Sequence, residues 1–371
     1  MTPLWTTRLE GSLNASVIRR SAATRGGVRP RGVYSRDVRL LLSILLILMF
    51  VPSYSVLPPA PRLRAQGRMI VRAVPLDSGD PARRRVGRLT YLGGVSLSSD
   101  DPAFGGFSSI HVDGDRFTLL SDGGTVIRFR MRPGWRISNL SFGDLPGGPG
   151  TGWEKSDRDS ESMAVDPVSG TTWVGFEKYN AIWKYARGLA RAEARARPGA
   201  MAEWPENGGP EAMVRLRDGR FVVFSESAAW PHHKGRAALV FERDPTVDPS
   251  DGFRFSYAAP HHYDPSDAAE LPNGDLLVLN RRFALPYDFT AILTVVPRAA
   301  IAPGRAVAGV PIATFAAPLI HDNFEALAVT REGADTIVWM ASDDNQSMLQ
   351  RSLLLKFRLD PADTKKAPHR P

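Results

Sequence analysis

Hydrophobic and polar residues alternate in short runs from Arg88 to Asp360, and Gly, Asp, Asn and Pro separate the runs. A two-residue period bounded by turn-forming residues is typical of β-strands, whereas a helix repeats its apolar positions every three or four residues. The pattern therefore predicts an all-β domain over residues 88–360, with little helix.

The strand pattern itself repeats with a period of about fifty residues. The leading positions of the copies are Ser109, Glu161, Glu211, Asp267 and Glu325, at spacings of 52, 50, 56 and 58 residues. The copies read FSSIHVDGDRFTLLSDGGTVIRFRM (107–131), SESMAVDPVSGTTWVGFEKYNAIWKYA (160–186), PEAMVRLRDGRFVVFSE (210–226), SDAAELPNGDLLVLNRRF (266–283) and FEALAVTREGADTIVWMASDD (324–344). The first copy is the weakest match.

Each copy has the same internal plan. A short strand follows the leading position, a turn such as Asp218-Gly219 or Asn273-Gly274 suits a tight hairpin, and further apolar strands follow. Four strands at this period indicate a β-propeller blade. We predict a β-propeller of five or six four-stranded blades. Its ring is closed between the N- and C-terminal strands, GRLTYLGGVSLS (87–98) beside SLLLKFRL (352–359).

Four of the five leading positions are acidic. The first strand of a propeller blade lines the central channel, so these side chains are expected to share one space. Converging carboxylates repel one another and are costly to desolvate unless a cation or fixed donors neutralise them. Oxygen ligands, with no Cys and few His in the chain, favour Ca²⁺ over Zn²⁺. We therefore predict a calcium site formed by Glu161, Glu211, Asp267 and Glu325.

A second polar ring is expected where the second strands end, from Asp122, Glu177, Glu226, Asn280 and Asp343. Arg281 and Arg282 follow in the copy that lacks an acid there. A guanidinium at this place either holds a phosphate bidentately or pairs with the carboxylate of a neighbouring blade. With Asp343, these two arginines are our candidate substrate-binding residues.

Several of these acids have a structural alternative. The leading acids could accept hydrogen bonds from backbone N–H groups of the next blade instead of binding a cation. Asp159, Asp322 and Asn323 lie just upstream in loops, where such residues either complete an oxygen shell or cap turns. The sequence leaves both alternatives open.

Candidate proton-transfer residues are His321 and Asp322, which immediately precede the copy that contains Glu325. No G-x-S-x-G or H-E-x-x-H motif and no phosphate-binding glycine loop is present in the sequence. Serine chemistry is therefore poorly supported, and a water nucleophile is the simpler expectation.

The positive charge is concentrated at the N-terminus. Residues 1–88 contain sixteen Arg and four acids, a net charge of +12, while the whole chain carries +8. The remaining residues are therefore net acidic, which argues against nucleic-acid binding by the body. The absence of Cys excludes disulfides and thiolate metal sites.

One long apolar run, Leu40–Val51, follows Arg36 and Arg39 and precedes a small-x-small stretch at residues 53–55. Twelve residues match the core of a signal peptide and fall short of the roughly 20 needed to span a bilayer. We expect residues 1–55 to be a basic leader with a signal peptide or signal anchor, residues 56–87 a flexible basic linker and residues 361–371 a disordered tail. Export to the periplasm or cell envelope is the main expectation. Attachment to the inner membrane through residues 38–57 is the alternative.

The segments RDSESMAVDP, GPEAMVRLRDGRFVVFSES, DAAELPNGDLLVLNRRF and DNFEALAV resemble the bacterial phytase-like β-propeller family, whose members are described as esterase-like. The resemblance covers roughly residues 88–360. It implies an exported propeller, usually six-bladed, and calcium-assisted hydrolysis of phosphate or other esters. Its residue-level support is limited to the acids within RDSE, PEA, SDAAE and DNFE.

Two functions therefore stand as hypotheses. The first is a metal-assisted hydrolase whose partner is a small-molecule ester or phosphate. The alternative is a non-catalytic propeller of the cell envelope that binds a ligand or another protein. Fold alone does not choose between them, because propellers serve both purposes.

Overall fold

The computed structural model describes residues 38, 40–45, 62–64, 67–286, 288–347 and 349–361. The chain divides into two units, residues 1–56 and 57–371. In the first unit the described residues, 38 and 40–45, are helical. Most of the predicted leader and nearly all of the predicted C-terminal tail lie outside the described residues. Among the residues that are described, no helix is long and apolar enough to cross a membrane.

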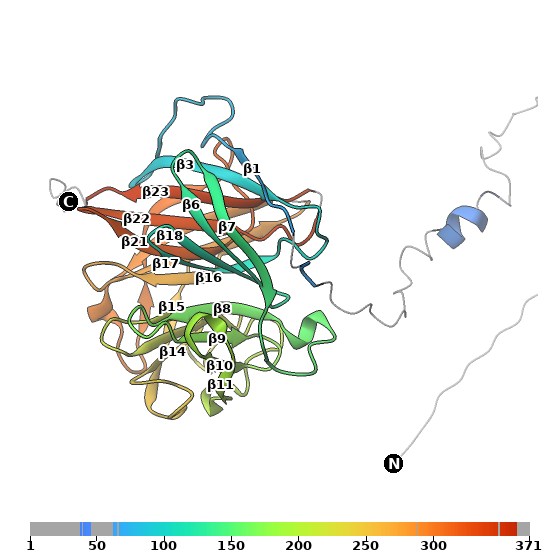
Figure 1. Cartoon of the computed structure of the whole chain (residues 1–371). Helices are drawn as coiled ribbons and strands as arrows, with labels where there is room; N and C mark the ends of the chain where they lie inside the picture. The colour runs from blue at the N-terminus through green and yellow to red at the C-terminus, as the bar shows by residue number, and fades with distance from the viewer. Residues whose placement is uncertain are drawn as a thin grey trace, which may run out of the picture. The chain divides into compact units, whose positions relative to one another are not determined.

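The second unit is built from five sheets of short antiparallel strands (Figure 1). The sheets of the first four copies of the repeat contain β4 (Phe107–Asp113), β5 (Arg116–Ser121), β6 (Thr125–Arg132) and β7 (Arg136–Asp144); β8 (Ser160–Val165), β9 (Thr172–Phe176), β10 (Ala181–Tyr185) and β11 (Ala192–Ala196); β12 (Pro210–Arg215), β13 (Phe221–Ser225), β14 (Arg236–Phe241) and β15 (Gly252–Ala258); and β16 (Asp264–Glu270), β17 (Leu276–Ala284), β18 (Asp288–Val296) and β20 (Val310–Phe315).

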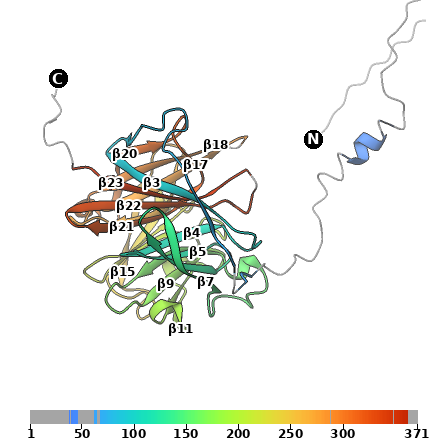
Figure 2. The same ribbon diagram turned by 45° about the horizontal axis from the view of Figure 1, so that its top comes forward.

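The fifth sheet combines both ends of the unit. It contains β21 (Phe324–Glu332), β22 (Asp335–Ser342), β23 (Ser352–Leu359), β3 (Leu89–Ser98) and β1 (Ile70–Ala73), with β2 (Arg85–Val86) paired to β3. The antiparallel pairing of β3 with β23 sets Leu97 opposite Ser352 and Leu89 opposite Leu359, as the sequence predicts (Figure 2).

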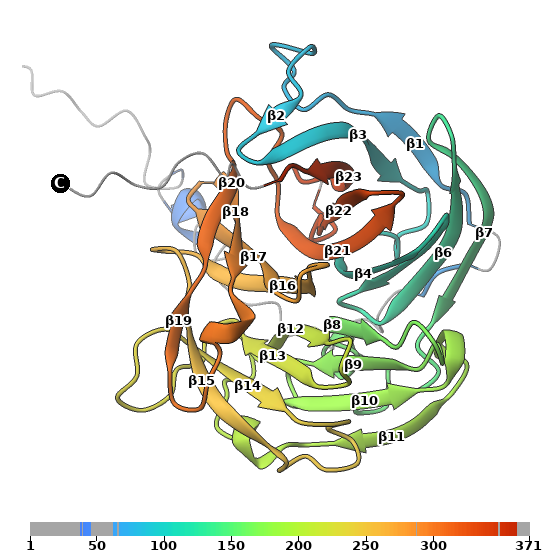
Figure 3. The ribbon, with the colours of Figure 1, turned by 90° about the vertical axis from the view of Figure 1, so that its left-hand side faces the viewer.

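One strand of each sheet, β4, β8, β12, β16 or β21, lies nearest the centre of the propeller (Figure 3). The inner strands β4, β8, β12, β16 and β21 contact one another in that order, and β21 contacts β4. The sequence prediction of an all-β propeller is therefore confirmed. The loops between strands include four short 3-10 helices: η1 (Lys155–Asp157), η2 (Arg187–Leu189), η3 (Gly199–Met201) and η4 (Arg298–Ala300).

The described residues form five blades. The segments between the clear copies of the repeat complete these sheets and form no further blade: residues 228–262 contain β14 and β15, and residues 298–322 contain β20. The same stretch contains β19 (Ala306–Ala308), which pairs parallel to the outer strand β15.

Part of the predicted linker belongs to the propeller. β1 pairs with β3 along its whole length, and Leu76 is fully buried in the hydrophobic core beside Phe315 and Leu319. The expectation of a flexible segment over residues 56–87 is therefore wrong for residues 70–87. Arginine-rich composition concealed a short edge strand, whose exposed side chains need not be apolar.

The hydrophobic core lies between adjacent sheets. Phe117 of β5 packs edge-on against Trp339 of β22, with ring centroids 4.8 Å apart, and Trp173 of β9 packs in the same way on Phe221 of β13 at 4.9 Å. Because these contacts join neighbouring blades, the core fixes how each inner strand faces the next. That arrangement determines which side chains meet at the centre.

Candidate functional site

Every inner strand carries a β-bulge near its first residue. The register between the first and second strands slips by one residue in all five blades. The extra residues are Ser108, Glu161, Glu211, Ser266 and Glu325. A bulge bends the strand and redirects one side chain, so the repeated slip places one bulged residue per blade around the centre. We call the region around these five bulged residues, at the centre of the propeller, the acidic mouth.

The bulge register corrects two positions of the repeat. Ser108 and Ser266 are the structural equivalents of Glu161, Glu211 and Glu325. The repeat in the sequence instead predicts Ser109 and Asp267 at these positions. The hydroxyl of Ser108 donates to the carbonyl of Ser160 at 2.6 Å, and that of Ser266 donates to the carbonyl of Phe324 at 3.1 Å. In these two blades the bulged side chain therefore bonds the next inner strand.

Asp267 is not among the grouped acids of the mouth. One of its oxygens accepts the N–H of Leu327 in the next inner strand at 2.6 Å, and the other accepts its neighbour Ala268 at 2.8 Å. Burial raises its pKa well above the ordinary value, and these two hydrogen bonds oppose the rise. The carboxylate of Asp267 therefore binds backbone N–H groups, which is the alternative to cation binding that the sequence left open.

The ring at the ends of the second strands contains one arginine. In the register Arg281 of β17 takes the place held elsewhere by Asp122, Glu177, Glu226 and Asp343, while Asn280 lies one residue earlier. Asn280 is fully buried and accepts a hydrogen bond from Tyr257 at 2.8 Å. The predicted ring position of Asn280 is therefore wrong by one residue.

Arg281 is the central cation of the mouth. Its Nη2 lies 2.7 Å from Glu226 and 3.7 Å from Glu211, and its Nε lies 3.3 Å from Glu325. Burial alone would lower the pKa of this guanidinium, but Glu325, Glu226 and Glu211 outweigh burial and raise it. Of the two roles considered for Arg281, phosphate binding and pairing with carboxylates of neighbouring blades, its contacts in the structure are those of the second.

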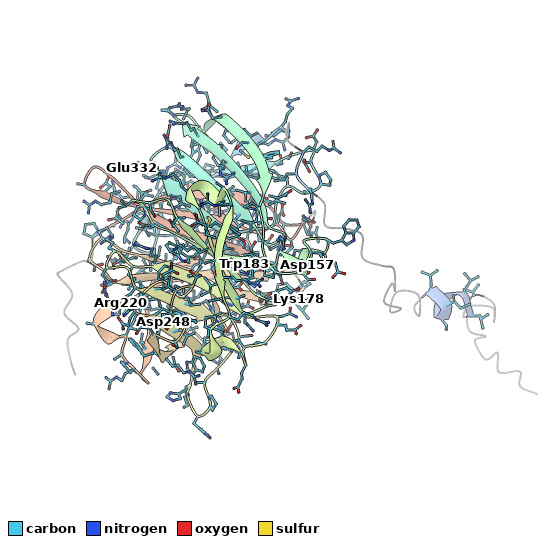
Figure 4. The ribbon with its side chains drawn as sticks, turned by 60° about the horizontal axis from the view of Figure 1, so that its bottom comes forward. Asp157, Lys178, Trp183, Arg220, Asp248 and Glu332 are labelled. Atoms are coloured by element: carbon cyan, nitrogen blue, oxygen red, sulfur yellow. The ribbon has the colours of Figure 1, made fainter. Side chains whose placement is uncertain are left out.

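Lys155 is a second cation at the mouth, and the sequence analysis did not identify it. It lies in η1 and forms an ion pair with Asp122. The η1 loop is anchored by neighbouring bonds: Asp157 accepts the N–H groups of Thr151 at 3.0 Å and Gly152 at 2.9 Å, and Lys178 donates to Ser156 at 2.9 Å (Figure 4). Its TGWEKSDR sequence carries no strand period, so only the tertiary fold reveals the position of this lysine.

Among the described residues Glu177, Asp159 and Glu161 form no ion pair, whereas Glu211 and Glu226 contact Arg281. Ligand oxygens of Asp159, Glu161 and Glu177 lie within 4.8 Å of one another, and so do those of Glu177, Glu211 and Glu226. Glu211 is only 4% exposed, and its Oε2 is buried with no hydrogen-bond partner among the described residues. An unpartnered buried carboxylate oxygen is costly and is the kind of atom that a bound cation satisfies.

Mutual repulsion appears in the pKa values. Burial raises the pKa of Glu161 well above its ordinary value, and the charges on Glu211 and Asp159 raise it further. Burial, with help from Asp159 and Glu226, raises the pKa of Glu177 to about 7 against the hydrogen bond from the N–H of Gly208. Without a cation, these acids therefore tend to keep protons near neutral pH.

His321 and Asp322, the predicted proton-transfer residues, contact other groups and not each other. The Nδ1 of His321 lies 2.7 Å from the carbonyl of Leu319. Asp322 accepts Nε of Arg351 at 3.0 Å and the N–H of Asn323 at 3.1 Å. The structure provides no hydrogen bond between His321 and Asp322. Arg351, which lies immediately before β23, was not identified from the sequence.

Arg282 and Asp343, the other two predicted substrate-binding residues, lie in different surroundings. Arg282 lies over the ring of Tyr263 at 5.6 Å and 3.7 Å from Asp288, so it does not share the contacts of Arg281. Asp343 is buried, and burial together with Glu325 and Asp122 raises its pKa well above the ordinary value. Asp343 thus belongs to the mouth, whereas Arg282 does not.

Replacing Arg281 by Met should lower the free energy of unfolding at pH 7 by about 3–5 kcal/mol, because Glu211, Glu226 and Glu325 would lose their shared cation. Urea unfolding measures this change. The control Arg220→Gln removes a half-buried arginine that is ion-paired at the surface, and it should cost less than about 1 kcal/mol. Equal losses in the two variants would show that Arg281 does not neutralise the mouth.

When a chelator is present, the free energy of unfolding should fall as the pH rises from 4.5 to 7. The folded pKa of Glu177 is about 7 against an ordinary 4.5, so the folded state binds the extra proton. The stability that this proton provides is complete below pH 4.5 and is lost as pH rises through 7, on the order of 1–3 kcal/mol. Glu177→Gln should flatten the profile in urea unfolding. An unchanged slope in the variant would contradict the assignment.

Comparisons with known proteins give distant structural similarities. They include hydrazine synthase of Kuenenia stuttgartiensis (14% identity, 70% of this chain and 67% of that chain, TM-score 0.33) and the Malassezia sympodialis allergen Mala s 1 (12% identity, 78% and 94%, TM-score 0.39). No curated protein matches the chain. At these TM-scores the assignment of the fold depends on the strand pairing described above.

The family comparison is more informative. A family model described as "Esterase-like activity of phytase" matches residues 102–346, which begin just before β4 and end just after Asp343. The match therefore includes all five inner strands and every acid of the mouth. The chain belongs to the phytase-like family.

Proposed function

We propose that the protein is a metal-assisted hydrolase of phosphate or other esters that acts at the acidic mouth. The observation that carries the proposal is the buried Oε2 of Glu211, which has no partner among the described residues and lies among carboxylates that outnumber the cations. The description of the family as esterase-like supports the class of reaction.

The donor set fits a hard divalent cation. Asp159, Glu161, Glu177, Glu211 and Glu226 would hold it, because their oxygens approach one another within two overlapping groups that share Glu177. A set composed of carboxylate oxygens favours Ca²⁺ over softer metals. A cation bound there would neutralise charge on an ester and lower the pKa of a water molecule.

The chain itself contributes orientation. Arg281 fixes the carboxylates of Glu226 and Glu325, and the amide of Asn323 donates to Glu325 at 2.8 Å. These contacts offset charge on Glu226 and Glu325, and they leave Asp159, Glu161 and Glu177 without an ion pair among the described residues, so a bound cation would neutralise mainly these three acids. Asp322 is less suited to proton transfer than the sequence suggested, because both of its oxygens already accept hydrogen bonds. His321 uses Nδ1 for the carbonyl of Leu319, which leaves its Nε2 as the nitrogen that could transfer a proton.

A non-catalytic binding propeller is the second candidate. It is favoured by the number of mouth residues that already have internal partners, including Arg281 with three glutamates and Lys155 with Asp122. A site whose charges are largely balanced internally needs only a shaped rim to bind a ligand.

Calcium should bind the chelator-treated protein saturably and raise its melting temperature. A hundredfold excess over Kd stabilises the native state by about 2.7 kcal/mol. Hydrolysis of p-nitrophenyl phosphate or p-nitrophenyl butyrate should require the cation, and Glu161→Gln should reduce binding and turnover at least tenfold. The control Glu332→Gln, at the far end of β21 (Figure 4), should change neither.

The outcomes separate the two functions. Calcium binding without hydrolysis of either ester would leave the binding propeller. A melting curve that ignores both calcium and chelator would reject the metal site and the hydrolase together.

We also propose that the protein is exported, on the strength of the apolar run Leu40–Val51 behind Arg36 and Arg39. Mass spectrometry of the protein from its native envelope should find a mature N-terminus near Val56. Intact residues 1–50 in the cytoplasmic fraction would contradict export, and the same residues in the membrane fraction would indicate an anchor.

A further inference from the structure

A groove of about 420 Å³ lies between the blade of β4–β7 and the blade of β8–β11. It is found near the last residues of β4 and β8, whereas the acidic mouth is formed where these strands begin. Its walls come from β4–β7 on one side and from β8, β9 and η2 on the other (Figure 3). The volume falls within the range of small-molecule sites. It is independent of the residues assigned to hydrolysis.

The floor of this groove is apolar. Phe117 and Phe129 stack with ring centroids 5.1 Å apart, and Leu189 of η2 closes the opposite wall. Met163 of β8 is half-buried between them. Phe117 and Phe129 are 2% exposed and Leu189 is 6% exposed, so the apolar side chains that an entering group could cover are chiefly the half-buried Met163 and Val165.

The rim of the same groove is cationic. Arg128 donates to the carbonyl of Gly188 at 2.8 Å, and Arg187 donates to the carbonyl of Val168 at 2.8 Å. Within the described part of the chain, neither guanidinium forms an ion pair with a carboxylate, and the guanidinium of Arg116 has neither a hydrogen bond nor an ion pair. Arg130 differs, because both oxygens of Asp115 accept its Nη1 at 3.1 Å.

Three guanidinium groups without a carboxylate around one apolar floor are unusual in a domain whose net charge is negative. Burial lowers the pKa of Arg128, which is the cost of a charge that lacks an anion. His111 also lines the groove, and burial lowers its pKa more than Asp113 raises it, so it is neutral at pH 7 and can donate one N–H. An anion would satisfy these groups together.

We propose that this groove binds a small organic anion, a carboxylate or phosphate attached to an apolar chain or ring. The anionic group would lie against Arg116, Arg128 and Arg187, because guanidinium groups bind such oxygens bidentately. The apolar part would lie on Phe129, Met163 and Leu189. The site is separate from the acidic mouth and does not depend on the proposed hydrolysis.

Calorimetric titration with monomeric decanoate, decyl phosphate, inorganic phosphate and decylamine tests the proposal. Decanoate and decyl phosphate should bind one per chain, and their relative affinities would show which anion is preferred. Inorganic phosphate and decylamine should bind at least tenfold more weakly, because each lacks one half of the recognised chemistry. Affinity for both anions should also fall with added salt.

The Arg116→Gln/Arg128→Gln variant should lose at least tenfold in affinity for decanoate. The matched control Arg136→Gln/Arg191→Gln removes two exposed arginines that belong to the same two blades and do not line the groove, and it should bind normally. Circular dichroism and thermal melting verify that both variants are folded. Absence of saturable binding, equal binding of decylamine, or equal losses in the two variants would overturn the proposal.

Discussion

Repulsion among carboxylates at the centre of the ring is the constraint on which the rest of the site depends. Glu161, Glu211 and Glu325 enter one space because each is the extra residue of a β-bulge at the same place in its blade. Arg281 relieves part of this repulsion and Lys155 relieves another part. Among the described residues Asp159, Glu161 and Glu177 form no ion pair, and burial raises the free-energy cost of their charges.

The fold creates this constraint through packing between blades. The aromatic contacts of Phe117 with Trp339 and of Trp173 with Phe221 set the angle between neighbouring sheets. Hydrogen bonds donated by Ser108 and Ser266, and one that Asp267 accepts from Leu327, then tie inner strands to their neighbours. The same repeated position therefore serves as a structural link in two blades and as an acid in three. A fixed scaffold of this kind can hold like charges together because it cannot spread to separate them.

Acids gather where the inner strands begin, whereas Arg116, Arg128 and Arg187 line a groove beyond the ends of β4 and β8. The proposed cation and the proposed organic anion would therefore bind at different places. Because separate residues would form the two proposed sites, substitutions at one can be examined without altering the other.

The sequence by itself determined the strands, the repeat, the pairing of the terminal strands and the presence of acids at the leading positions. Alternation and turn residues are local, and a period of about fifty residues survives in the order of the chain. Local pattern could not detect a one-residue bulge, so Asp267 and Asn280 were assigned to positions that Ser266 and Arg281 hold. It also could not show that Lys155 and Arg351 reach the acids, since loop residues have no period. Only the tertiary structure decided which carboxylates share a cation and which do not, because that depends on distances between blades that lie far apart in the chain.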